Sequence, residues 1–171
     1  LYDDFFYRRN NEFWKDKAMQ KLPALLDSTG MLACGEDLGM IPATVPQVMD
    51  DLRILSLEIQ RMPKSVEETF AHPANYPYLS VCTTSTHDMN PIRAWWEEDR
   101  QVTNDFWQMI LGNQGEAPYF CEPWICRQIL EQHVWSPAML TILPLQDWLS
   151  MDAQLRREDP NTERINVPAN S

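Results

Sequence analysis

Between residues 8 and 27 the apolar side chains recur every three or four positions, which is the spacing of one face of a helix. These side chains are Phe13, Trp14, Ala18, Leu22, Leu25 and Leu26. Pro23 falls inside the pattern and should bend or restart the helix, because proline lacks the N–H that an inner turn needs. Ser28, Thr29 and Gly30 are turn residues, so the predicted helix ends before them.

Four short apolar runs follow, and each has the length and composition of a buried strand. They lie near residues 31–35, 54–61, 78–85 and 139–146. Strands that alternate with helices or long loops are typical of parallel βα units, so the pattern predicts an α/β fold.

Helical patterns and one long loop separate these runs. A helix that Thr44 can cap is predicted after the first run, and the Pro-containing residues 62–78 are predicted to be a loop. Another helix begins near Pro91, and residues 102–134 are predicted to be mostly helical, with a break at LGNQGEAP.

A pair of polar residues lies at the end of each predicted strand. The pairs are Glu36 and Asp37, Gln60 and Arg61, His87 and Asp88, and Gln146 and Asp147. The carboxyl ends of parallel strands meet at one edge of a sheet, where βα loops form binding sites. The periodicity does not decide between an open sheet and a barrel. A (β/α)8 barrel takes eight units and about 250 residues, so four units would be half of one.

Composition narrows the classes of partner. The net charge of −11 would repel a phosphate backbone, so we expect no nucleic acid partner. No apolar segment approaches the ~20 residues of a membrane-spanning helix, so we expect no membrane insertion. The four cysteines are too few for a disulfide framework, and Cys121 and Cys126 lack the further ligands that zinc needs, so no metal site is predicted. Buried reduced thiols are expected instead, which is typical of a cytoplasmic protein.

Two of the polar clusters lie in longer motifs that identify a family. GEDLGMIP at residues 35–42 and TSTHD at residues 84–88 resemble the signature of glycoside hydrolase family 77, the 4-α-glucanotransferases or amylomaltases. LEIQRMP, RAWWEED and LPLQDW are most similar to the branch that contains the plant cytosolic disproportionating enzyme. The resemblance covers nearly the whole chain.

The resemblance implies a fold, a reaction and a substrate class. Family members have a (β/α)8 barrel, so the four predicted strands would be its fifth to eighth. The chain would then be the C-terminal half of a (β/α)8 barrel, with residues 1–171 forming a partial catalytic domain truncated at both ends. The missing initiator Met and the ends LYDDFF and NVPANS agree with that expectation. The implied partners are α-1,4-glucans, maltose and maltooligosaccharides, and no cofactor is implied.

The resemblance also implies a role for individual residues. Glu36 corresponds to the general acid/base, and Asp88 corresponds to the residue that binds sugar hydroxyls and stabilises the transition state, assisted by His87. Asp37 is expected to support Glu36 by hydrogen bonding. The family nucleophile, an Asp in an Arg-x-Asp-His motif after the fourth strand, has no counterpart in these residues. We therefore expect the chain alone to be inactive.

Gln60 and Gln146 are further candidates for contacts in the substrate groove, and Asp37 and His87 are included in the same set of candidate substrate contacts. Buried structural pairing of Gln60 and Arg61 is an alternative that the sequence leaves open.

The other candidate residues have simpler structural interpretations as well. Glu36 can be a turn carboxylate between glycines, and Asp88 can cap the next helix by accepting from amides near Asn90. Five tryptophans can stack on sugars, but most tryptophans at helical spacing are core residues, so none of the five is a candidate site residue. They are Trp95, Trp96, Trp124, Trp135 and Trp148.

Two other functions compete with the enzyme hypothesis. A non-catalytic carbohydrate-binding fragment would keep sugar contacts without a nucleophile. A doubly wound ligand-binding domain would need a Gly-rich phosphate loop, which is absent from a chain with five glycines. Half a barrel would also expose sheet edges, so self-association is possible.

Overall fold

The computed structural model describes residues 2–4, 8–39 and 41–167, and its centre is a parallel sheet. Strands β1 (Ser56–Ile59), β2 (Ser80–Thr83) and β3 (Leu140–Thr141) lie in the order β1-β2-β3. Ser56 pairs with Ser80, and Val81 pairs with Leu140. A parallel bridge between Cys34 and Leu55 adds a further segment beside β1. Neighbouring segments thus follow chain order, and the predicted α/β fold with a parallel sheet is confirmed.

Two of the predicted strands are much shorter than expected. The run at 31–35 forms only the bridge at Cys34, held by the Gly35 N–H to Leu55 O and the Leu55 N–H to Ala33 O. The run at 139–146 is a strand only at 140–141, because Pro144 has no N–H for the sheet and instead precedes a helix. Strands β1 and β2 fall inside their predicted ranges.

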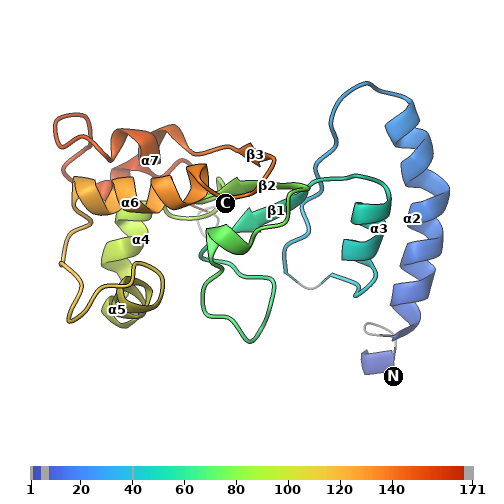
Figure 1. The fold of residues 1–171 in the computed structure, drawn as a ribbon, viewed down its shortest axis with the longest axis horizontal. Helices are drawn as coiled ribbons and strands as arrows, with labels where there is room; N and C mark the ends of the chain where they lie inside the picture. The colour runs from blue at the N-terminus through green and yellow to red at the C-terminus, as the bar shows by residue number, and fades with distance from the viewer. Residues whose placement is uncertain (1, 5–7, 40, 168–171) are drawn as a thin grey trace.

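The helices gather at the two ends of the view in Figure 1, with the sheet between them. At one end lie α4 (Ile92–Glu98), α5 (Arg100–Met109), α6 (Pro123–Val134) and α7 (Leu145–Leu149). At the other end lie α2 (Asn10–Asp27) and α3 (Val45–Asp51). Three short elements complete the described fold: α1 (Tyr2–Asp4) and the 3-10 turns η2 (Pro73–Asn75) and η3 (Pro160–Glu163).

Helix α2 packs against α3 and runs through Pro23 without a break. Thr44 is the N-terminal flanking residue of α3, but its side chain does not cap that helix. Its hydroxyl donates to the carbonyl of Asn11 at 3.1 Å, and the side-chain oxygen of Asn11 accepts from the Ala43 N–H at 2.9 Å. The expected cap at Thr44 is therefore wrong, and the hydroxyl ties the loop to α2 instead.

The larger core cluster lies among α4, α5 and α6. Trp96, Phe106, Ile125 and Leu130 are almost completely buried there. The core position predicted for the tryptophans holds for Trp96, and Trp95 packs partly buried against the same cluster. It is wrong for three others, which are exposed: Trp124, Trp135 and Trp148. Trp124 lies at the start of α6, Trp135 directly follows its end and Trp148 lies on the five-residue α7, so the helical spacing did not place them inside.

The cysteines are reduced in the structure, and three of the four are buried. Cys82, Cys121 and Cys126 lie inside as expected, whereas Cys34 is exposed. Cys121 and Cys126 contact each other, with their sulfur atoms 3.4 Å apart.

His133 on α6 is a fully buried titratable group. Its Nδ1 lies 2.8 Å from the carbonyl of Ile129, and its Nε2 has no hydrogen-bond partner in the described part of the chain. Burial, together with the nearby positive charge of Arg61, lowers the pKa of His133 to about 4, and the hydrogen bond to the carbonyl of Ile129 opposes that shift. The core therefore holds a neutral imidazole.

This buried imidazole predicts a loss of stability in acid. The unfolded chain takes up a proton on this histidine near pH 6.5, but the folded chain does so only near pH 4, so stability falls as pH drops through that window. The expected contribution of His133 to the loss between pH 7 and pH 4 is about 3 kcal/mol in the free energy of unfolding, taken as the difference between the wild type and a variant without the imidazole. Urea denaturation at both pH values measures it. His133→Asn keeps an N–H near the position of Nδ1 and should lose this part of the pH dependence. An equal pH dependence in the variant would contradict the assignment.

Candidate active site

Glu36 lies in the loop between the Cys34 bridge and α3, and its side chain is exposed. Within the described residues it has no hydrogen-bond or ion-pair partner. It lines a mainly apolar pocket of about 330 Å³ formed with α2 and α3. The preceding Gly35 packs against α3: a Cβ there would lie 2.9 Å from Cε of Met49, so a larger residue would require the flexible end of that side chain to shift. The loop therefore presents a carboxyl group to solvent at the end of a paired segment.

Asp37, the next residue, has the opposite environment. It is 4% exposed, and its two oxygens accept hydrogen bonds from different groups. Oδ1 accepts from the Leu57 N–H at 2.9 Å, and Oδ2 accepts from Nζ of Lys64 at 2.7 Å. Of the two adjacent acids, one is buried and charge-paired and the other is open.

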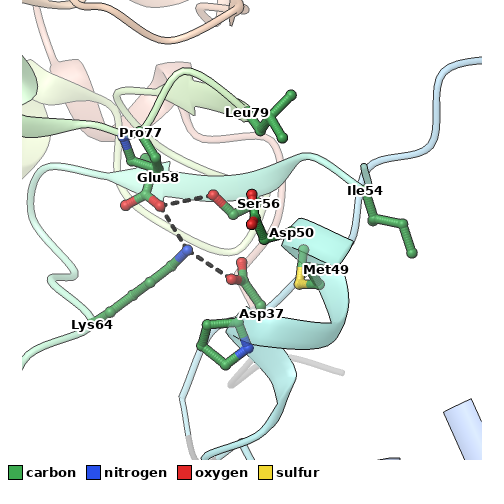
Figure 2. A pocket seen from close by; sticks show the side chains of 10 residues that line it. Asp37, Met49, Asp50, Ile54, Ser56, Glu58, Lys64, Pro77 and Leu79 are labelled. Carbon is green, nitrogen blue, oxygen red and sulfur yellow. Dashed lines mark hydrogen bonds and ion pairs between the residues drawn. The ribbon is translucent and has the colours of Figure 1, made fainter. Parts of the chain in front are cut away.

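Lys64 is a member of this site that the sequence did not single out. Its Nζ also donates to Oε1 of Glu58 at 2.7 Å, so one ammonium group joins two carboxylates (Figure 2). The residue lies in the segment predicted only as a loop, and no periodic signal marks it. The sequence offered one hint to its role: Lys64 is a basic residue close to several acidic ones in a loop that contains prolines.

His87 and Asp88 follow β2 on an exposed loop. Nε2 of His87 lies 3.2 Å from Oδ2 of Asp88. The C-terminal segment holds this loop: Nδ2 of Asn166 donates to Oδ1 of Asp88 at 2.5 Å, and Nη2 of Arg164 donates to its carbonyl at 3.0 Å. Asp88 does not cap α4, so the helix-cap interpretation is wrong.

The residue that binds the first N–H of α4 is Asp147. It is completely buried on α7. Its Oδ1 accepts from the Ile92 N–H at 2.9 Å, and its Oδ2 accepts from the Thr84 hydroxyl at 2.5 Å. Burial raises the pKa of Asp147, and the hydrogen bonds from Thr84 and Ile92 oppose that rise. Asp147 on α7 thus joins the end of β2 to the start of α4. Its two partners, Thr84 and Ile92, lie on either side of the loop that carries Asp88.

Gln146, the neighbouring candidate, is half-buried in the first turn of α7 rather than at a strand end. It lines a pocket of about 120 Å³ together with His87, Pro91 and Glu163. The structure therefore brings two of the predicted substrate contacts, His87 and Gln146, to one pocket. Glu36 and Asp37 line a different one.

Gln60 and Arg61 make structural contacts at the end of β1. Gln60 is 1% exposed, and its Nε2 donates to Oε1 of Gln132 on α6 at 2.9 Å. Arg61 donates to the carbonyls of Thr84 and Asn90 and lies over the ring of Trp95. Burial lowers the pKa of Arg61 to about 10, so its guanidinium stays charged at neutral pH. The sequence had left this pairing open as an alternative to substrate contact.

In the described part of the chain, no group of three or more His, Cys, Asp or Glu side chains gathers in a way that could hold a metal ion. None of the helices in residues 2–4, 8–39 and 41–167 is long and apolar enough to cross a membrane.

Comparison with known proteins identifies the family. The model of the family described as 4-alpha-glucanotransferase matches residues 1–171. The chain belongs to this family. It is 42% identical over 170 residues to 4-alpha-glucanotransferase DPE2 of Oryza sativa subsp. japonica, covering 99% of this chain and 18% of that protein. It is 31% identical over 155 residues to the 4-alpha-glucanotransferase of Chlamydia muridarum, covering 90% of this chain and 29% of the relative.

Among solved structures, the amylomaltase from Streptococcus agalactiae in complex with acarbose superposes with a TM-score of 0.63 at 18% identity. The match covers 88% of this chain and 28% of that one, and it shows a shared fold. The chain therefore spans less than a third of the length of each of these relatives.

Proposed function

We propose that these residues form the C-terminal half of the (β/α)8 catalytic barrel of a retaining 4-α-glucanotransferase. The parallel order of the Cys34 segment, β1, β2 and β3 supports this proposal, because neighbours in a barrel follow chain order. A doubly wound sheet would instead reverse its strand order at a switch point. The likeness of fold to an amylomaltase points the same way.

Glu36 is the general acid/base in this proposal, and its contrast with Asp37 is the observation that carries it. A retaining transfer needs a carboxylic acid that protonates the leaving glycosidic oxygen and then takes a proton from the incoming sugar hydroxyl. Such a group must reach the substrate. Glu36 is exposed and unpartnered among the described residues, whereas Asp37 is buried against Lys64 and Leu57. Only Glu36 has the freedom that the reaction requires.

Asp88 stabilises the transition state by accepting hydrogen bonds from sugar hydroxyls, and His87 assists it. These bonds strengthen as positive charge develops on the sugar ring. Both side chains are exposed on the loop after β2, and the contacts from Arg164 and Asn166 hold that loop. Gln146 is a further sugar contact at the same loop, since it lines a pocket with His87. Gln60 keeps only its buried structural role in this proposal.

The nucleophile is an Asp outside these 171 residues. It attacks the anomeric carbon, so the C–O bond breaks as the new ester bond forms, and the leaving oxygen takes the proton of Glu36. An acceptor hydroxyl then attacks the glycosyl-enzyme, returns its proton to Glu36 and releases the Asp. Donor and acceptor are both α-1,4-glucans or maltooligosaccharides, and the cycle consumes no cofactor.

Incubation with maltotriose alone tests this function in the complete protein. Transfer of glucan segments between identical donors gives both shorter and longer products, which chromatography separates. Hydrolysis alone would give only shorter products and would contradict the assignment as a transferase.

A further inference from the structure

Lys64 joins two carboxylates that lie on different segments of the chain. It lies in the loop after β1, and its Nζ is 2.7 Å from Oδ2 of Asp37 and 2.7 Å from Oε1 of Glu58. Figure 2 shows the ammonium group between the two carboxylates, with Glu58 on the strand and Asp37 on the loop that carries Glu36. The two carboxylate side chains are 3% and 12% exposed, and the side chain of Lys64 is 30% exposed. This is a largely buried, two-armed ion pair.

Each arm of this ion pair is anchored further. The hydroxyl of Ser56 donates to the same Oε1 of Glu58 at 2.9 Å, which fixes that carboxylate on β1. Oδ1 of Asp37 accepts from the Leu57 N–H at 2.9 Å. Asp37 is therefore held on β1 twice, directly by a backbone bond and indirectly through Lys64 and Glu58.

Glu36 lies between two fixed points. On its N-terminal side, the Gly35 N–H donates to the carbonyl of Leu55 at 2.8 Å. On its C-terminal side, Asp37 is held by the Leu57 N–H and by Nζ of Lys64. Glu36 itself has no partner in the described part of the chain, so the position of its carboxyl group depends on its two neighbours.

Removal of the ammonium group would leave two buried carboxylates facing each other without a counter-charge. An unpaired buried charge is strongly destabilising, and like charges repel. A pocket of about 240 Å³, lined by Asp37, Asp50, Glu58 and Lys64, adjoins the ion pair. It provides room for a released Asp37 side chain to turn and for water to enter.

We propose that Lys64 is a positioning residue for the proposed acid/base Glu36, acting through Asp37. The inference rests on the proposed function of Glu36. Lys64 touches neither substrate nor reacting atoms. It neutralises Asp37 and Glu58 and holds the loop at the distance from β1 at which Glu36 meets the glycosidic oxygen.

Lys64→Met in the complete protein tests this role by steady-state kinetics on maltotriose. A displaced catalytic group costs rate more than binding, so we expect kcat to fall by ~10- to 100-fold while KM changes little. Lys64→Arg restores most of the lost kcat, because a guanidinium supplies the charge and several donors. Lys21→Met is the matched control: Lys21 is exposed on α2 and makes no hydrogen bond or ion pair with the described residues, so the kcat of this variant should equal that of the wild type.

A second measurement covers the case in which Lys64→Met does not fold. Lys64→Gln keeps an uncharged donor between the carboxylates and should fold, yet it still loses kcat. Hydrogen exchange at the Leu57 amide should also quicken in this variant, since its acceptor Asp37 loses its positive counter-charge.

The outcomes separate the two proposals. Wild-type kcat in Lys64→Met or Lys64→Gln, beside an inactive Glu36→Gln, overturns the positioning role and leaves the proposed function intact. Full activity of Glu36→Gln overturns the proposed function, and the role of Lys64 falls with it. A loss in Lys64→Met that Lys64→Arg does not restore at all also overturns the role, because the charge would not be what matters.

Discussion

Replacing Glu36 by glutamine in the complete protein is expected to lower kcat on maltotriose by ~10²- to 10⁴-fold. Glutamine has nearly the same shape but can neither protonate the glycosidic oxygen nor take a proton from the acceptor. The side chain is exposed and makes no contact that the fold needs among the described residues, so the variant should fold and bind glucans as the wild type does. Kinetics and calorimetric titration with a maltooligosaccharide measure the two effects separately.

Glu131→Gln is the matched control for this substitution. Glu131 is an exposed glutamate on α6, and the same change of charge there should leave kcat unchanged. Substantial turnover by Glu36→Gln would show that another group performs the acid/base step. Loss of glucan binding together with turnover would make Glu36 a binding residue instead.

The second prediction with a large expected effect concerns the transfer activity of the 171-residue chain by itself. We expect no measurable transfer from maltotriose or maltose, because the chain has no Arg-x-Asp-His motif to supply the nucleophile. Chromatography of a long incubation, beside the complete protein at equal molar concentration, measures this. Longer products from the purified chain would contradict the placement of the nucleophile outside these residues.

The parts of the fold that the sequence predicted are those with local signals. Helix α2 follows from apolar spacing, and strands β1 and β2 follow from compact apolar runs between turn residues. The motifs around Glu36 and His87 were visible because each places polar residues at the end of a predicted strand and resembles part of a family signature. Local patterns determined which segments are elements and which loops carry chemistry.

The parts that the sequence missed depend on contacts between distant residues. Met31 and Leu32 look like strand residues but are exposed, since only Cys34 and its neighbours find a backbone partner, at Leu55 just before β1. The sequence marked Asp147 only as one of several polar residues at the ends of predicted strands. It holds an amide 55 positions earlier, and no spacing rule reports such a contact.

Lys64 shows the same limit within the candidate site. It is 27 residues from Asp37, in a segment whose prolines indicate only a loop. Its role depends on how that loop folds back over β1. An irregular, proline-rich loop has no periodicity from which the direction of a side chain can be predicted. The ion pair of Lys64 is therefore visible only in the structure.

Trapping the covalent intermediate tests the central claim, that Glu36 is the acid/base of a retaining transferase, most directly. The donor is α-maltosyl fluoride, whose leaving group needs no proton, applied to the Glu36→Gln variant of the complete protein. We predict a rapid burst of fluoride and a maltosyl-enzyme that accumulates, because the acceptor lacks its base. Peptide mass mapping should place the sugar on an Asp outside these 171 residues. The account would be contradicted by the absence of a burst, or by a sugar attached to a residue within this chain.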